Sequence, residues 1–270
     1  MTVRNIRLGA VGYLNARPLV YGLERSLRFL LRFDVPSTCA ALLHAGAIDV
    51  GLIPSIEYWR GGPYSIVPDL AIASRGPVAS VKLYSARPMS DVRSIAMDVS
   101  SRTSVALVRV LCARLFKISP KIESSSPDLP AMLGRCDAAL IIGDNALFQP
   151  PNLDRPLAVE PIDLGQAWTE WTGLPFVYAF WAGRADALGP GDVTALQQAR
   201  DAGVAASDEV AREYLWEAPA RQSVGARYLR DNIKYHLGDE ERAGLELFYR
   251  YASEIDVAPA SGGLRFYGQA

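Results

Sequence analysis

The chain has 270 residues, of which 50% are hydrophobic, and its 28 Lys and Arg nearly balance its 29 Asp and Glu. This length exceeds the usual single domain of about 100–200 residues, so we expect two lobes with buried cores. The balanced charge gives no indication of a nucleic-acid or membrane partner.

The N-terminal residues lack the long apolar run and cleavage site of a secretory signal, so we expect a cytoplasmic protein. No segment offers about 18 uninterrupted apolar residues for a membrane span. The three cysteines are odd in number and widely spaced, which is typical of reduced core residues. With only His44 and His236, and no Cys/His/Asp cluster, the sequence predicts neither a metal site nor a histidine-based triad.

The first quarter of the chain alternates strands and helices. Residues 5–11 (NIRLGAV) predict a short buried strand, and the turn GYLNAR then leads into a short helix that Pro18 could open. A second extended stretch, 30–35, leads to Ser37, which could cap a helix. Residues 48–54 (IDVGLIP) predict the next strand.

The same order of elements recurs from residue 92. Residues 92–99 (VRSIAMDV) predict a strand, the polar run 100–104 predicts a helix start, and 138–143 (AALIIG) predict a later buried strand. Such alternation predicts a mostly parallel α/β architecture, in which ligands bind at the carboxyl ends of the strands.

Two extended segments, 80–88 and 174–184, are predicted to cross between the lobes. The region 190–257 has a helical pattern and is expected to pack back onto the first lobe. We therefore expect lobe I to comprise residues 1–85 and 182–270, and lobe II to comprise residues 86–181.

Five long stretches together resemble the chorismate dehydratases of the futalosine pathway of menaquinone biosynthesis. They are GYLNARPL (12–19), PSTCAALLHAGAIDVGLIPSIEY (36–58), IVPDLAIASRGPVASVKLYS (66–85), DVSSRTSVAL (98–107) and WTEWTGLPFVYAFWA (168–182). The likeness runs along nearly the whole chain. The sister branch, the 1,4-dihydroxy-6-naphthoate synthases, usually begins with a Ser-Pro-Cys-Pro-Asn-Asp-type loop, which is absent here.

The resemblance implies a two-lobed α/β fold of the type II periplasmic-binding-protein kind. It also implies a cytoplasmic hydro-lyase that needs no cofactor or metal and removes water from chorismate, giving 3-[(1-carboxyvinyl)oxy]benzoate. Chorismate is then the expected small-molecule partner, and the sequence leaves the oligomeric state, a homodimer included, open. The alternatives are a non-catalytic binding protein for a small aromatic or carboxylate anion, and the sister naphthoate synthase.

Chorismate carries two carboxylates, and the sequence offers one polar helix start per lobe, with backbone N–H groups at 17–20 and 102–105. Asn15 and Ser80 are the catalytic candidates. The candidates for substrate binding are Arg17, Ser37, Ser100, Ser101, Arg102, Thr103, Ser104, Asp144, Asn145, Trp171 and Phe176. A turn-forming role for Asn15, a structural ion pair for Arg17 and core packing for the aromatic residues remain the alternatives.

An obvious proton acceptor is missing from these motifs. Glu57, Asp98, Asp144 and Glu170 are the candidate protein bases. The other hypothesis is that the substrate's own enolpyruvyl carboxylate takes the proton, while Asn15 and Ser80 position it and assist the departing hydroxyl.

Overall fold

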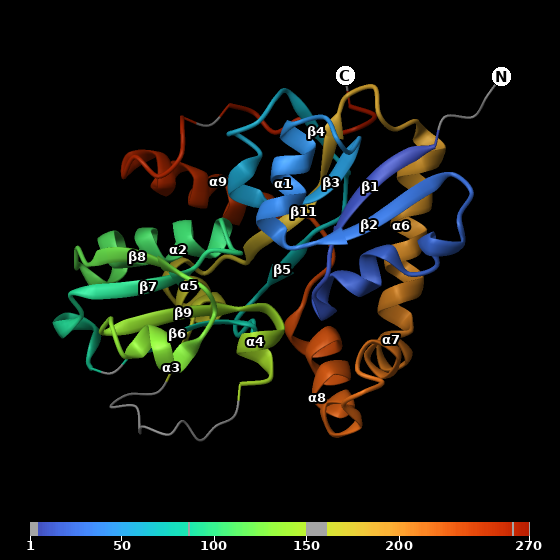
Figure 1. Ribbon diagram of the computed structural model, residues 1–270. Coiled ribbons are helices and arrows are strands. Elements are labelled where there is room, and N and C mark those ends of the chain that lie inside the picture. The colour runs from blue at the N-terminus through green and yellow to red at the C-terminus, as the bar shows by residue number, and fades with distance from the viewer. Residues whose placement is uncertain (1–4, 86, 150–160, 261, 270) are drawn as a thin grey trace.

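The computed structural model describes residues 5–85, 87–149, 161–260 and 262–269, and its strands form two separate sheets in two lobes (Figure 1). The first sheet has the order β2-β1-β3-β11-β4, with β5 also paired to β11. Its strands are β1 (Ile6–Val11), β2 (Phe29–Asp34), β3 (Val50–Pro54), β4 (Tyr64–Ile66), β5 (Ile72–Ser74) and β11 (Phe176–Arg184). The helices of this lobe are α1 (Pro36–His44), α6 (Pro190–Ala205), α7 (Ser207–Tyr214), α8 (Gln222–Arg227) and α9 (Asp239–Glu254).

The second sheet has the order β10-β6-β9-β7-β8. Its strands are β6 (Val81–Ser85), β7 (Ser94–Asp98), β8 (Lys121–Ser125), β9 (Ala138–Ile142) and β10 (Ile162–Asp163). Its helices are α2 (Thr103–Leu111), α3 (Leu129–Leu133), α4 (Gly143–Leu147) and α5 (Leu164–Thr172). Short 3₁₀ turns cover Leu14–Val20, Leu23–Arg25, Ser55–Glu57, Met89–Asp91 and Pro219–Arg221, and π-helical turns cover Cys112–Phe116 and Tyr228–Asn232.

The two lobes repeat one structural unit, as the sequence predicted. In the first, β1 runs parallel to β2 and β3, and β11 is antiparallel to β3. In the second, β7 runs parallel to β8 and β9, and β6 is antiparallel to β9. Strands β3 and β9 are buried along their whole length, which explains their continuous apolar sequences.

The antiparallel strand of each sheet follows a segment of the opposite lobe. The range 1–85, expected to form part of lobe I, ends with β6 (Val81–Ser85), a strand of the second sheet. The range 86–181, expected to form lobe II, ends with most of β11 (Phe176–Arg184), a strand of the first sheet. Strand β6 forms its backbone hydrogen bonds with β9, and β11 forms them with β3, each in the lobe that it enters. The chain therefore passes from one sheet to the other a few residues earlier than predicted.

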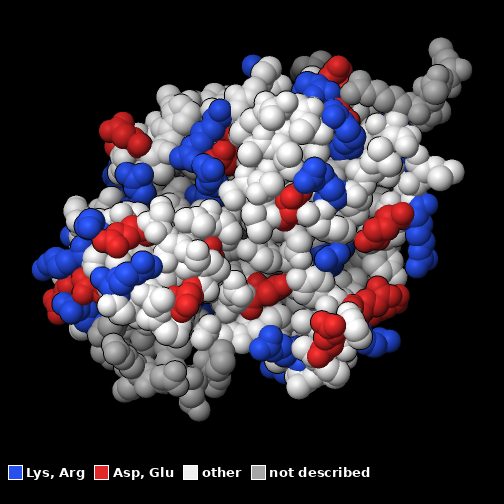
Figure 2. All heavy atoms as spheres, viewed as in Figure 1, with Lys and Arg blue, Asp and Glu red and all other residues white. Residues whose placement is uncertain are grey.

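Helices of the C-terminal region cover the first lobe but also contact the second. Helix α6 packs against the 3₁₀ turn Leu14–Val20, where a side chain at Gly203 would meet the backbone oxygen of Pro18 at 2.3 Å. Helix α9 contacts β11 in one lobe and α2 in the other. Among the described residues, no helix has the length and apolar character that crossing a bilayer requires. Acidic and basic side chains are interspersed over the face in Figure 2.

One aspartate at the same place in each repeat joins neighbouring strands. Asp49 precedes β3 and accepts hydrogen bonds from the Arg7 backbone N–H, at 2.9 Å, and from the guanidinium groups of Arg7 and Arg184. Asp137 precedes β9 and accepts from the Ser94 backbone N–H at 3.1 Å. Hydrogen bonds from Arg7 hold the pKa of the buried Asp49 carboxyl well below its usual range.

We expect Asp49→Asn to lower the free energy of unfolding by about 2–3 kcal/mol at pH 7, because hydrogen bonds to a charged group are lost. A folded-state pKa below the unfolded value stabilises the fold above about pH 4, and this contribution is lost as the pH falls. Urea unfolding should therefore show the two proteins converging between about pH 5 and pH 2. Asp186→Asn, at an exposed carboxylate 3.7 Å from Arg184, is the control. An equal loss in both variants would contradict the account.

Candidate active site between the lobes

A cavity of about 60 Å³ lies where the two lobes meet. It is lined by Val11, Tyr13, Asn15, Pro36, Pro54, Ile72, Val78, Tyr178 and Ala179 from the first lobe and its crossing, and by Ser80, Val81, Ser101, Thr103, Ser104, Ile142 and Gly143 on the second-lobe side. Val11, Pro54 and Ile142 are the last residues of β1, β3 and β9. The cavity therefore lies at the carboxyl ends of parallel strands from both sheets, where ligands bind in α/β folds.

The structure brings Asn15 and Ser80 into the wall of this one cavity. Ser80 is buried, and its Oγ accepts a hydrogen bond of 2.7 Å from the phenol of Tyr228. Asn15 Oδ1 is buried without a hydrogen-bond partner among the described residues. A buried amide oxygen left without a donor costs free energy, so a ligand that supplies a donor would relieve that cost.

The helix start of the second lobe also faces the cavity. Helix α2 begins at Thr103, and the buried side chains of Ser101, Thr103 and Ser104 line the wall. Ser101 Oγ accepts the Ser104 backbone N–H at 3.2 Å, and the Ile56 backbone N–H donates to Thr103 Oγ1 at 3.3 Å. The first N–H groups of a helix and its dipole favour an anion at this position.

The helix start of the first lobe is arranged differently from the prediction. The 3₁₀ turn begins at Leu14, four residues before Pro18, which lies inside the turn and does not open it. The Leu14 N–H donates to Asp144 Oδ1 at 3.2 Å, and the phenol of Tyr214 donates to the other oxygen of that carboxylate. Burial raises the pKa of Asp144, and the hydrogen bond from Tyr214 opposes that rise. A carboxylate of the protein itself thus occupies this helix start, and Asp144 does not line the cavity.

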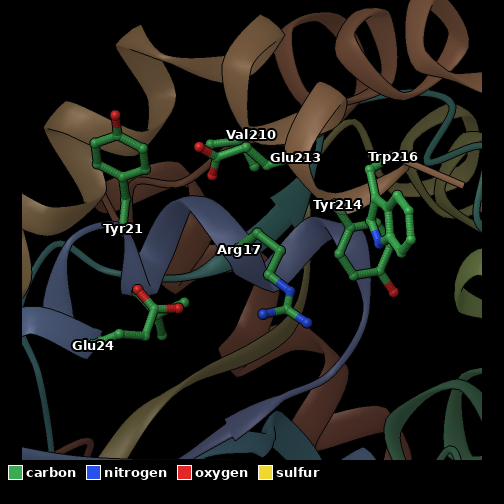
Figure 3. A pocket seen from close by; sticks show the side chains of 8 residues that line it. Arg17, Tyr21, Glu24, Val210, Glu213, Tyr214 and Trp216 are labelled. Atoms are coloured by element: carbon green, nitrogen blue, oxygen red, sulfur yellow. The ribbon is translucent and has the colours of Figure 1, made fainter. Parts of the chain in front are cut away.

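Arg17 lies outside the cavity as well. Its guanidinium carbon is 4.1 Å from the ring centroid of Phe33 and 4.9 Å from that of Tyr214. It lines a separate surface pocket of about 340 Å³. Figure 3 shows the side chain there, with Tyr214 and Trp216 on one side of it and Glu24 on the other. Two aromatic rings therefore flank this cation, and no ion pair of Arg17 is found among the described residues.

Four polar candidates also lie off the cavity wall. Ser37 lies inside the first turn of α1 without capping it, and its N–H donates to the Ser100 carbonyl at 3.3 Å. The Ser100 hydroxyl donates to Asp98 at 2.6 Å. Arg102 is exposed, and its guanidinium is 4.0 Å from Glu57, while Asn145 is exposed on α4. Their side chains belong to turns and surfaces that flank the cavity.

Trp171 and Phe176 pack in an aromatic cluster instead of forming the cavity wall. Both contact Trp168 edge to face, with ring centroids 5.9 Å and 5.2 Å away, and Trp171 stacks on Tyr251. Edge-to-face pairs of this kind stabilise a core. The aromatic side chains that do reach the cavity are Tyr13 and Tyr178.

No Asp, Glu, His, Lys or Arg is found among the described residues that line the cavity. Its titratable groups are the phenols of Tyr13 and Tyr178, whose pKa values are raised mainly by burial. The candidate bases are engaged elsewhere: Glu57 with Arg60 and His44, Asp98 with Ser100, Asp144 with Leu14 and Tyr214, and Glu170 with Gln166. Within the described ranges, no three His, Cys, Asp or Glu side chains group as metal ligands would.

Sequence reasoning missed two tyrosines of the cavity wall and a third that lies behind it. Tyr13 and Tyr178 lie within the quoted stretches GYLNARPL and WTEWTGLPFVYAFWA, so their position there was the available signal. Tyr228 lies 148 residues after Ser80, in a region whose sequence predicts helix only, and no local pattern connects the two.

Known proteins resemble the chain in both sequence and fold. A family model described as menaquinone biosynthesis matches residues 6–254. The chain is 31% identical to the chorismate dehydratase of Thermus thermophilus over 255 residues, which span 89% of this chain and 93% of that protein.

Solved structures extend the likeness of the fold. A protein of Archaeoglobus fulgidus superposes with a TM-score of 0.75 at 17% identity, covering 95% of this chain and 100% of that one. The periplasmic aliphatic sulphonate-binding protein of Escherichia coli superposes with a TM-score of 0.63 at 15% identity, covering 95% and 94%. The predicted two-lobed, periplasmic-binding-protein-like fold is confirmed, and by its sequence the chain belongs to the menaquinone biosynthesis family.

Proposed function

We propose that the protein is a chorismate dehydratase, a hydro-lyase that converts chorismate to 3-[(1-carboxyvinyl)oxy]benzoate and water. This reaction opens the futalosine route to menaquinone, and a cytoplasmic location is part of the proposal because chorismate is made there. The observation that carries it is the cavity wall, which combines a helix start, hydroxyl groups and an amide with no described acid, base or cation. The similarity to the Thermus thermophilus chorismate dehydratase supports it.

The start of α2 receives the ring carboxylate of chorismate. Backbone N–H groups and the hydroxyls of Ser101, Thr103 and Ser104 supply donors there, each charge-assisted hydrogen bond contributing about 1.5–3 kcal/mol. The proton that leaves is on the ring carbon bearing the ether, and its electron pair is delocalised through the ring into this carboxylate. Donors placed where negative charge develops lower the barrier to that step.

The enolpyruvyl carboxylate of the substrate takes this proton, because no described side chain of the cavity wall can act as a base. It meets Asn15 and Ser80 rather than a helix start, since Asp144 already occupies the start at Leu14. A carboxylate with fewer donors keeps a higher pKa and is a better proton acceptor. The adjacent ring hydroxyl then leaves as its C–O bond breaks, the ring becomes aromatic, and the transferred proton completes a molecule of water.

The lobes must separate to admit the substrate. A cavity of about 60 Å³ is far smaller than the roughly 300–1,000 Å³ of ligand pockets. The chain passes between the sheets at the segments before β6 and before β11, and movement there would widen the cavity. Closure over the substrate then excludes water during the elimination.

Incubation of the purified protein with chorismate, in the presence of a chelator, tests the activity. We expect the absorbance of the cyclohexadiene to disappear as an aromatic enol ether forms. The amount of product measured by chromatography should equal the amount of chorismate consumed. Tight binding of chorismate without turnover would favour the binding-protein alternative, and the proposed activity would then be wrong.

Asn15→Leu and Ser80→Ala should each lower kcat by about 100-fold or more, because a group that acts in the transition state is removed. The dissociation constant for chorismate, measured by calorimetry, should change much less. Asn145→Leu and Ser90→Ala change exposed residues of the same types and serve as controls. Turnover that survives the first pair but is abolished by Glu57→Gln, with binding intact, would assign the base to the protein.

The kcat of the wild type should stay constant between about pH 6 and pH 9, since no described group of the wall titrates there. Burial raises the pKa values of Tyr13 and Tyr178 above the ordinary value for a phenol. Both therefore remain protonated donors through this range and lose their protons only above about pH 10. A bell-shaped profile with a limb near neutral pH would indicate a protein acid or base instead.

A further inference from the structure

Tyr228 lies directly behind Ser80, outside the cavity wall. Its phenol donates to Ser80 Oγ over 2.7 Å, a normal length for an O–H···O bond, and its side chain is only 2% exposed. It is the first residue of the π-helical turn Tyr228–Asn232, which follows α8. Such turns break the regular helix and frequently occur at functional sites, where they aim a side chain.

The hydrogen bonds of Ser80 leave one group free to meet a ligand. A serine hydroxyl has one hydrogen to donate and two lone pairs that accept. Tyr228 donates to one lone pair, and the structure gives the Ser80 hydroxyl hydrogen no acceptor among the described residues. Because Ser80 lines the cavity, its hydroxyl hydrogen is free to point into the cavity.

The backbone before Ser80 is held in a strained conformation. Ala79 has a φ of 62°, in the left-handed region that residues with a Cβ rarely adopt. Asp163 stabilises this turn by accepting the backbone N–H groups of Val78, at 3.0 Å, and of Ala79, at 2.6 Å. The Ser80 carbonyl in turn accepts the Gly143 N–H at 2.8 Å. Strain that several hydrogen bonds maintain is typical of residues placed for function.

The phenol of Tyr228 keeps its proton and can therefore donate a hydrogen bond. Burial raises its pKa above the ordinary value for a phenol. The phenol therefore carries its proton at neutral pH. A hydroxyl that accepts a strong hydrogen bond also becomes a better donor, by roughly 10–30% per bond in a chain of such bonds.

We propose that Tyr228 is a positioning residue for Ser80, which it fixes by donating to Oγ so that the serine's own hydrogen points into the cavity, toward the reacting part of the substrate. The inference rests on the proposed dehydratase function. Tyr228 acts through Ser80 and has no contact with the reacting atoms in this account.

Tyr228→Phe keeps the buried ring and removes only the hydroxyl. We expect kcat for chorismate to fall about 10–100-fold, with KM changed less than about threefold, because a donor that acts in the transition state is misdirected while binding is retained. Tyr58→Phe is the matched control, since Tyr58 is also buried, donates to the Tyr64 carbonyl and lies off the cavity wall. It should lower Tm to a similar extent and leave kcat unchanged.

Two further comparisons decide between positioning and simple support of the fold. Added to Ser80→Ala, the Tyr228→Phe change should cause no further loss of kcat, because its effect passes through the serine. The inference would be overturned if Tyr228→Phe had the same kcat as Tyr58→Phe, or if adding Tyr228→Phe to Ser80→Ala lowered kcat further. In either case, turnover by the wild type would still support the dehydratase function. A wild-type protein that does not convert chorismate would overturn both.

Discussion

The antiparallel pairing of β11 with β3, and of β6 with β9, determines where the site lies. Strands β6 and β11 each enter one sheet from the other lobe, so the chain crosses twice at the same place. The carboxyl ends of β1, β3 and β9 then meet around one cavity, and Ser80 and Tyr178 reach it from the crossing segments themselves. The strand exchange therefore supplies both the walls of the site and the two connections at which it would open.

Electrostatics then distinguishes the two helix starts that meet near this cavity. Asp144 from the second lobe occupies the start at Leu14, whereas the start of α2 is open to the cavity. A dianionic substrate would consequently meet one strong anion site and one weaker, amide-and-hydroxyl site. In the proposed mechanism this asymmetry has a use, since the carboxylate with fewer donors stays basic while the other accepts the charge that develops. A wall without described ionised side chains also leaves no competing base.

Much of this architecture could be predicted from the sequence, because strand periodicity, helix starts and the repeat are local features. The alternating and apolar runs predicted β1, β7 and β9 correctly, and the candidates Asn15, Ser80, Ser101, Thr103 and Ser104 line the cavity between the lobes. Arg17 and Asp144 were expected there too, but the direction of a helix start and the partner that fills it depend on tertiary contacts. Likewise, the bond between Tyr228 and Ser80 joins residues 148 positions apart, and nothing local in the sequence encodes it.

In the proposed mechanism, the substrate supplies the base that the described residues of the cavity wall lack. This mechanism is tested most directly with a chorismate derivative in which the enolpyruvyl carboxylate alone is converted to a neutral amide. The account predicts that this derivative binds through its ring carboxylate at the start of α2 but is not dehydrated, whereas chorismate is. Dehydration of the amide at a rate comparable to that of chorismate would contradict the account and require a base from the protein.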